Sequence, residues 1–347
     1  MDTHLRARLQ AACGLLALAL SSACGGAAEE EVGSRLILGA YTTPREAYSE
    51  LIPIFQSRWE SQRGQPVTFE ESYLGSGAQS RAIIEGFEAD VAALSLEVDI
   101  ERIAEAGLIT HDWRSAPSGW LVSTSIVAFA VRPGNPLGIR DWADLARPGV
   151  EVLTPNPRTS GGAMWNILGL YGAAVRGGVQ GVPAGDQEAA TEFLQAVLRN
   201  VSVMDKSARD SMTTFENGVG DVAITYENEV LVGQQAGQGY ELVIPGSTIL
   251  IENPVVLVDE YVDQHRMRPA AEAFVAFLFT PEAQEIFARH GLRSQNPAVA
   301  ASTAAFYPPV RDLFTIEEQF GGWDTATPRF FSEQGIFTLA ISQVQGE

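Results

Sequence analysis

The sequence predicts an α/β protein in which strands and helices alternate along the chain. Short apolar runs with strand character are each followed by a segment whose apolar residues recur at helical spacing, and the first such run is residues 35–41. This alternation is typical of largely parallel sheets covered by helices. A chain of 347 residues is long enough for two domains, each with its own core.

The first strand leads into a helix that opens with capping signals. We interpret Thr43 as its N-cap, Pro44 as its first helical residue and Glu46 as the partner in a capping box. Arg63-Gly64 should end this helix. The elements expected next are a strand at 67–72, a helix that includes 83–87, a strand at 90–96 and a short helix at 100–105.

A strand at 125–132 precedes the most informative stretch, TPNPRTSGGAMWNILGLY at 154–171. Its prolines indicate extended geometry, its apolar residues then follow helical spacing, and Ser160 stands at the N-cap position. The other expected elements are helices at 141–145, 187–198, 207–217, 269–279 and 281–290, strands at 151–153, 201–204, 221–226, 241–245 and 255–258, a loop at 177–185, and a tail at 306–347 whose aromatic residues should cover the core.

Charge restricts the classes of partner. The formal net charge is −20, and Lys206 is the only lysine. Nucleic acid and anionic membrane surfaces are therefore poor candidates, because both require a basic footprint. An anionic ligand would also be repelled at long range, so it must be held by dipoles and hydrogen bonds at short range.

The N-terminus carries a secretory signal at residues 1–24, with arginines followed by a short apolar core. Cys24 resembles the acylated cysteine of a bacterial lipoprotein lipobox, although Ser21 stands where an aliphatic residue is usual. The alternative is ordinary signal-peptidase cleavage near Ala23 or Ala27. Either cut removes Cys13, so no disulfide framework is expected. Residues 25–34 then form a flexible acidic tether.

Four hydroxyl-bearing helix starts directly follow predicted strands, at Thr42/Thr43, Ser76, Ser160 and Ser207. In open α/β sheets ligands collect at this edge, where free N–H groups and the helix dipole favour an anion. Gly161 and Gly162 remove side chains that would keep a ligand from the backbone. The alternative is a set of ordinary capped helices. Micromolar binding requires about 8 kcal/mol, so several charge-assisted bonds of about 1.5–3 kcal/mol each must converge.

Six runs of the sequence together carry a resemblance to a known family: YTTPRE (41–46), LGSGAQSRAIIEGFEADV (74–91), DWADLARPGVEVLTPNPRTSGGAMWN (141–166), SARDSMTTF (207–215), GVGDVAITYENE (218–229) and FGGW (320–323). With these runs the chain resembles the periplasmic sulfate- and thiosulfate-binding proteins of ABC importers. The resemblance implies a two-lobed, type II solute-binding fold with a hinge and a central cleft, and capture of sulfate or thiosulfate for an ABC permease. It also implies a periplasmic monomer without cofactor or metal. We place lobe I at 35–124 and 250–347, and lobe II at 125–249.

The family's ligand contacts can be carried over by position. They fall on the Thr42 backbone, Ser76, Ser160, Gly161, Gly162, the Ala208 backbone and Tyr226, with Gly75, Gly77 and Arg209 in support. Arg209 could contact the ligand, but we favour a brace formed with a carboxylate. The family usually has aspartate at position 42 and tryptophan at position 226. A phenol can accept a hydrogen bond as well as donate one, so Tyr226 leaves phosphate and molybdate open as alternatives to sulfate.

Other functions are less well supported by the sequence. A secreted serine hydrolase would need a histidine near Ser76 or Ser160, yet the histidines lie far away in sequence and no Gly-x-Ser-x-Gly elbow or P-loop occurs. Anion sensing is an alternative function that the sequence also allows. The histidines beyond the signal are His111, His265 and His290. The carboxylates chemically able to bind a cation are Asp90, Glu97, Asp99 and Glu227, and we favour capping or surface roles for them.

Overall fold

The computed structural model describes residues 35–116 and 119–346, all within one unit of the chain. The predicted signal at 1–24, including Cys24, and the tether at 25–34 lie outside the described residues. The strands are β1 (Arg35–Tyr41), β2 (Thr68–Leu74), β3 (Val91–Ala93), β4 (Leu121–Val131), β5 (Val152–Pro155), β6 (Val201–Asp205), β7 (Val222–Tyr226), β8 (Glu241–Val243), β9 (Ser247–Leu257), β10 (Arg293–Ser294) and β11 (Asp312–Phe314).

Helices follow most of these strands, as the alternating pattern predicts. They are α1 (Arg45–Arg63), α2 (Ser76–Ile84), α3 (Glu97–Glu105), α4 (Trp142–Leu145), α5 (Gly161–Val175), α6 (Gln187–Arg199), α7 (Ala208–Glu216), α8 (Glu227–Gln235), α9 (Asp259–Gln264), α10 (Arg268–Leu278), α11 (Pro281–Arg289), α12 (Pro297–Thr303), α13 (Ile316–Phe320), α14 (Trp323–Phe331) and α15 (Ile336–Gly346), with short 3-10 turns at Trp113–Ser115 and Ala304–Phe306.

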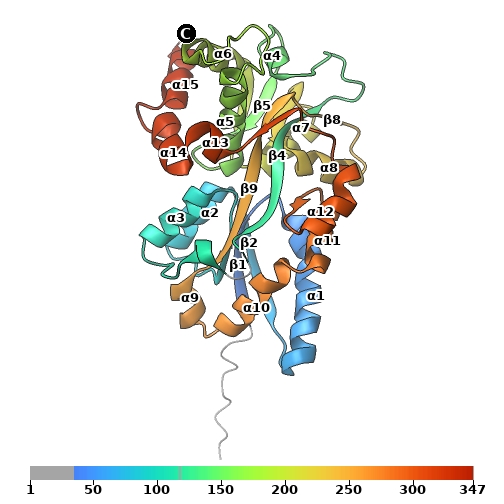
Figure 1. Cartoon of the computed structure of the whole chain (residues 1–347), viewed down its shortest axis with the longest axis vertical. Helices are drawn as coiled ribbons and strands as arrows, with labels where there is room; N and C mark the ends of the chain where they lie inside the picture. The colour runs from blue at the N-terminus through green and yellow to red at the C-terminus, as the bar shows by residue number, and fades with distance from the viewer. Residues whose placement is uncertain (1–34, 117–118, 347) are drawn as a thin grey trace, which may run out of the picture. The chain divides into compact units, whose positions relative to one another are not determined.

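The sheet is mixed, with strand order β2-β1-β3-β9-β4-β7-β5-β6. Strands β1, β2 and β3 are parallel, as are β5, β6 and β7. The expectation of a largely parallel sheet is wrong at β4 and β9, which run antiparallel to each other and to their neighbours β7 and β3. These two 11-residue strands run between the two parallel groups, as Figure 1 shows, so they tie one half of the sheet to the other.

Two large apolar cores flank these long strands. One packs β1, α1, α10 and α11 together, and the other packs β4, β5, α5 and α6. The aromatic tail belongs to the second core, where Phe314, Phe320 and Phe330 are buried, so the expectation that the tail covers the core is confirmed. Helices α14 and α15 accordingly lie at the α5 and α6 end in Figure 1.

The start of α1 differs from the predicted capping box. Pro44 occupies the N-cap position, and no side chain caps the helix. Glu46 instead receives two hydrogen bonds from Arg209, at 2.5 and 2.9 Å. The capping box is wrong because a guanidinium from a distant helix competes for this carboxylate and forms the stronger, charge-assisted contact.

Other helix ends agree with the sequence. Ser207 caps α7, with its Oγ accepting from the Asp210 N–H at 3.1 Å. Gly64 ends α1 in the left-handed conformation at φ 69°, which glycine adopts without strain. No helix in the described part of the chain combines the length and apolar character needed to cross a membrane.

Candidate functional site

The predicted helix starts all lie at carboxyl ends of parallel strands. Strands β1 and β2 end at Tyr41 and Leu74, immediately before Thr42 and the start of α2. Strands β5 and β6 end at Pro155 and Asp205, before the starts of α5 and α7. Because parallel neighbours end at the same edge of a sheet, each half of the molecule presents its helix starts along one edge.

The α5 start is buried and closely surrounded. Ser160 is its N-cap, but its hydroxyl makes no capping bond, and Gly161 and Gly162 follow as the first helical residues. The first N–H groups of an α-helix have no acceptor within the helix. A Cβ atom on Gly161 would lie 2.9 Å from Ser95 Oγ, and one on Gly162 would lie 2.7 Å from a ring carbon of Tyr226. Only glycine fits at these two positions.

Two further predicted residues meet the same point. The Gly162 Cβ position lies 3.4 Å from the Cβ of Ala208, the first residue of α7. Tyr226 is the last residue of β7 and is 1% exposed. Its ring centroid lies 6.2 Å from that of Tyr41, the neighbour of half-buried Thr42. The starts of α5 and α7 and the end of β1 therefore gather around Tyr226.

The α2 start abuts the segment before α5. The Ala78 N–H donates to the Thr159 carbonyl at 3.2 Å. A Cβ on Gly75 would lie 2.4 Å from that same carbonyl oxygen, so glycine is required there, whereas Gly77 has ordinary space around it. The Thr159 hydroxyl also donates to the Lys206 carbonyl at 2.8 Å, which joins the segments before α5 and α7.

Ser76 makes contacts that sequence reasoning did not predict. Its Oγ donates to Asp99 Oδ2 at 2.6 Å and accepts from the Ser95 N–H at 3.0 Å. Asp99 is fully buried, and burial raises its pKa although Arg102, at 2.6 Å, opposes the change. Ser76 thus lies at the edge of the site, but its hydroxyl donates its hydrogen bond to the Asp99 carboxylate.

Sequence reasoning also missed Ser95. Its Oγ lies 2.5 Å from the Tyr226 hydroxyl, and its carbonyl accepts from Trp165 Nε1 at 3.0 Å. Burial raises the pKa of Tyr226 well above 10.0, so this phenol is protonated at neutral pH. Ser95 follows β3, the parallel neighbour of β1. A serine just after a strand end is the same signal that selected Ser76, and it could have identified Ser95.

Arg209 forms the brace that we expected. Its guanidinium contacts Glu229 at 2.7 Å and Glu46 at 2.5 Å, so it joins α7 to α8 and α1. Glu229 is nearly fully buried, and burial raises its pKa while Arg209 opposes that rise. Since both nitrogen faces of Arg209 engage carboxylates, its charge is compensated before any ligand is considered.

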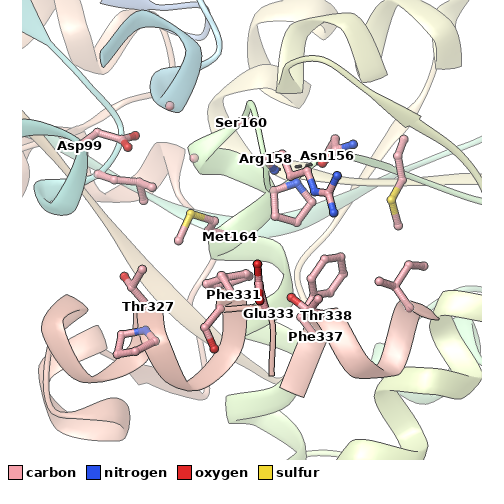
Figure 2. Close-up of a pocket in the computed structure, with 18 of the residues that line it drawn as sticks. Asp99, Asn156, Arg158, Ser160, Met164, Thr327, Phe331, Glu333, Phe337 and Thr338 are labelled. Carbon is pink, nitrogen blue, oxygen red and sulfur yellow. Dashed lines mark hydrogen bonds between the residues drawn. The ribbon is translucent and has the colours of Figure 1, made fainter. Parts of the chain in front are cut away.

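A cavity of about 750 Å³ adjoins the start of α5. Figure 2 shows Ser160, Asn156 and Arg158 on one side of it and Phe331, Phe337 and Thr338 on the other. Arg81 and Arg102 also line it. Two carboxylates line it as well, those of Glu333 and of Asp99, which pairs with Arg102. The exposed Arg158 makes no side-chain ion pair within the described residues, so it places a positive charge on this rim.

The residues weighed for catalysis or metal binding have structural partners. His111 contacts Asp259 at 2.7 Å, His265 contacts Asp90 at 2.8 Å, and His290 contacts Glu50 at 2.9 Å. None of these histidines contacts Ser76 or Ser160. Glu97 pairs with Arg114, and Glu227 with Arg293. Within residues 35–116 and 119–346, no three His, Cys, Asp or Glu side chains gather in a way that could hold a metal ion.

Comparison with known proteins places these features in context. The family model of bacterial extracellular solute-binding proteins matches residues 36–293. The chain is 45% identical to a sulfate-binding protein of Synechocystis sp. over 90% of its own length and 87% of the relative. It is 36% identical to a thiosulfate-binding protein of Pseudomonas aeruginosa, covering 94% and 97%.

A solved structure gives the same answer for the fold. The sulfate-binding protein SubI from Mycobacterium tuberculosis superposes with a TM-score of 0.78 at 37% sequence identity. The match covers 86% of this chain and 100% of SubI. The mixed sheet described above is therefore that of two-lobed, type II solute-binding proteins.

Proposed function

Because the chain belongs to the bacterial extracellular solute-binding proteins, we propose that it captures sulfate or thiosulfate outside the cytoplasm and delivers it to an ABC permease. Family membership makes it a binding protein rather than an enzyme. The observation that carries the proposal is the meeting of the α5 and α7 starts with Tyr226 at one buried point, in a chain closely related to sulfate binders.

We propose that the anion is held mainly by backbone N–H groups. The donors would be those of Thr42, Gly161, Gly162 and Ala208, with the hydroxyls of Ser160 and Tyr226. Six bonds to a charged acceptor, at about 1.5–3 kcal/mol each, exceed the roughly 8 kcal/mol that micromolar binding requires and leave a margin for dehydration. No lysine or arginine side chain is needed at the anion, which suits an acidic protein.

Ser76 remains a proposed ligand, but we expect it to contribute less binding free energy than the other donors. Its hydroxyl must turn from Asp99 to donate to the anion, so part of the gain is offset by a lost charge-assisted bond. Gly75 supports the site by allowing the α2 start to approach Thr159, whereas a Cβ at Gly77 would make only ordinary contacts, so the structure gives Gly77 no such part. Arg209 supports it by holding the start of α7.

We keep the crossovers between the proposed lobes, 35–124 with 250–347 and 125–249, and propose one change for the tail. Strands β4 and β9 pair with each other up to Ile126 and Leu250. Past that pair β4 continues along β7, whereas residues 247–249 of β9 pair with β11, which supports crossovers near these residues. The core shared by the tail with α5 and α6 favours assigning residues from about 312 onward to the second lobe instead.

We further propose that Cys24 is acylated and anchors the protein to a bacterial membrane, and that the protein acts as a monomer. An extracytoplasmic location itself follows from the family. Mass spectrometry of the protein purified from membranes tests the anchor. A diacylated N-terminal cysteine is expected, and a free N-terminus near Ala23 or Ala27 would exclude it.

Isothermal titration calorimetry with sulfate, thiosulfate, phosphate and molybdate tests the proposed function. We expect tight binding of sulfate or thiosulfate without turnover. Failure of both sulfur oxyanions to bind, or hydrolysis of a sulfate ester, would reject the proposal. Tight binding of molybdate alone would support the alternative oxyanion instead.

Replacing Tyr226 with tryptophan should raise the ratio of sulfate to phosphate affinity. An indole N–H only donates a hydrogen bond. A phenol can also accept one from the proton that phosphate keeps at neutral pH. Competition calorimetry measures the ratio directly. A ratio equal to that of the wild type would show that Tyr226 does not set selectivity.

Arg158→Gln should slow anion association without changing dissociation. Arg158 lines the cavity beside the α5 start, and a local positive charge raises the capture rate of an anion that the net charge repels. We expect a reduction of about two- to threefold at low ionic strength that disappears at high salt. Stopped-flow tryptophan fluorescence measures both rates.

The matched control is Arg140→Gln, since Arg140 is also exposed but does not line the cavity. It removes the same charge from the chain. Equal effects of the two substitutions would mean that net charge matters and that the cavity is not a route of capture.

A further inference from the structure

Ser95 has all of its polar groups engaged across the candidate site. Its N–H donates to Ser76 Oγ at 3.0 Å, its carbonyl accepts from Trp165 Nε1 at 3.0 Å, and its Oγ lies 2.5 Å from the Tyr226 hydroxyl. The residue is 1% exposed. Ser95 therefore links the end of β3 to α2, α5 and β7.

The Ser95 and Tyr226 hydroxyls border the two glycines that begin α5. The Cβ position of Gly161 lies 2.9 Å from Ser95 Oγ, and that of Gly162 lies 3.3 Å from the Tyr226 hydroxyl oxygen. Both hydroxyls therefore lie against the two residues whose N–H groups we propose to hold the anion.

Two hydroxyls that bond to each other differ from a single indole N–H. One of their two hydrogens is used between them, the other stays free to donate, and both oxygens keep lone pairs. Burial raises the pKa of Tyr226, so the phenol keeps its proton and its ability to donate. The Asp99 oxygens accept from Ser76 and Arg102, and neither is hydrogen-bonded to the Ser95 or Tyr226 hydroxyl in the described structure.

We propose that Ser95 is a specificity-determining residue of the anion site, which with Tyr226 donates a hydrogen bond to one oxygen of the ligand and accepts a hydrogen bond from the acid O–H of another. The site then takes monoprotonated tetrahedral oxyanions, such as hydrogen phosphate, alongside fully deprotonated sulfate. This inference rests on the proposed anion site.

Ser95 is needed because a single hydroxyl oxygen is poorly placed both to donate a hydrogen bond to the anion and to accept one from it. A lone phenol would have to donate to, and accept from, neighbouring oxygens of one small anion, and hydrogen bonds weaken steeply at poor angles. The pair divides these tasks between two atoms that stand 2.5 Å apart. Sulfate has no proton to give, so it needs only the free donor.

The test is Ser95→Ala, with sulfate and inorganic phosphate titrated separately by calorimetry at pH 8. We expect phosphate affinity to fall about tenfold or more and sulfate affinity to fall less than about threefold. A purely structural role would weaken both anions by the same factor. An equal loss, or wild-type protein that binds sulfate but shows no phosphate binding, would overturn the proposal.

Ser80→Ala is the matched control. Ser80 is buried in α2, and its Oγ donates to the Asp99 carbonyl at 2.7 Å, so the substitution removes a comparable hydroxyl away from Tyr226. The affinity ratio should stay at its wild-type value in this variant. If Ser80→Ala changed the ratio as much as Ser95→Ala, the effect would come from altered packing around Asp99. That result would contradict the proposed role of the Ser95 and Tyr226 hydroxyls.

A second variant keeps the test decisive if Ser95→Ala does not fold. Tyr226→Phe removes the other hydroxyl and should also weaken phosphate more than sulfate. Where Ser95→Ala does fold, the phosphate affinity lost in the double variant should not exceed the larger single loss, because the two hydroxyls act as one unit. Additive losses would contradict the inference. If the wild-type protein bound none of the anions, the proposed function itself would be rejected instead.

Discussion

Replacing Gly161 with valine should abolish measurable sulfate binding by a protein that still folds. A Cβ at this position would lie 2.8 Å from Leu96 Cγ and 2.9 Å from Ser95 Oγ, and two further methyl groups would cover the N–H groups at the α5 start. Leu96 and Ser95 belong to the predicted first lobe and Gly161 to the second. The substitution should therefore block closure over the anion while each lobe keeps its own core.

The expected loss is at least about a hundredfold in affinity, since two or more charge-assisted bonds are removed. Calorimetry measures the affinity, and circular dichroism with a thermal melt checks the fold. Gly239→Val is the matched control: Gly239 is exposed, has no positive φ, and its Cβ would meet only Pro133 at 3.5 Å. Wild-type affinity in a folded Gly161→Val protein would remove the α5 start from the site.

Local sequence signals identified most elements of the fold. The strand β1, the helix α6 and the helix α11 agree with prediction because apolar periodicity and capping are properties of neighbouring residues. Strand direction is not such a property. The antiparallel course of β4 and β9 depends on partners far along the chain, and polar residues with Pro254 inside β9 hid its full length from the sequence.

The same distinction separates what could be predicted of the site from what could not. Helix starts at Ser160 and Ser207 were visible because a hydroxyl followed by small residues is a local signal. The contact of Ser95 with Tyr226 spans 131 positions, and that of Arg209 with Glu46 spans 163. Neither pairing has a local signature in the sequence. The Ser95–Tyr226 contact was therefore missed, and the Arg209–Glu46 contact replaced the capping box that we expected.

Replacing Arg209 with methionine should destabilise the protein by about 3 kcal/mol at neutral pH, because removal of one partner leaves a buried charge uncompensated. The Glu229 side chain is 2% exposed and receives a 2.7 Å contact from Arg209. Methionine keeps much of the apolar stem, so the loss reports the charge more than the packing. Thermal and urea unfolding measure the change. Equal stability of variant and wild type would show that the brace contributes nothing.

The destabilisation should depend on pH in a defined direction. Burial raises the pKa of Glu229 above its ordinary value of 4.5, and loss of Arg209 should raise it further. Between 4.5 and the raised folded value, the folded variant holds a proton that the unfolded chain has released, so its free energy of unfolding falls as pH rises. The penalty should thus be large at pH 8 and small near pH 5. Adding Glu229→Gln should restore most of the stability at pH 8 and remove this pH dependence, because the group that titrates is gone; a double variant that stays as unstable and as pH-sensitive as Arg209→Met would place the cost at Glu46 or in packing.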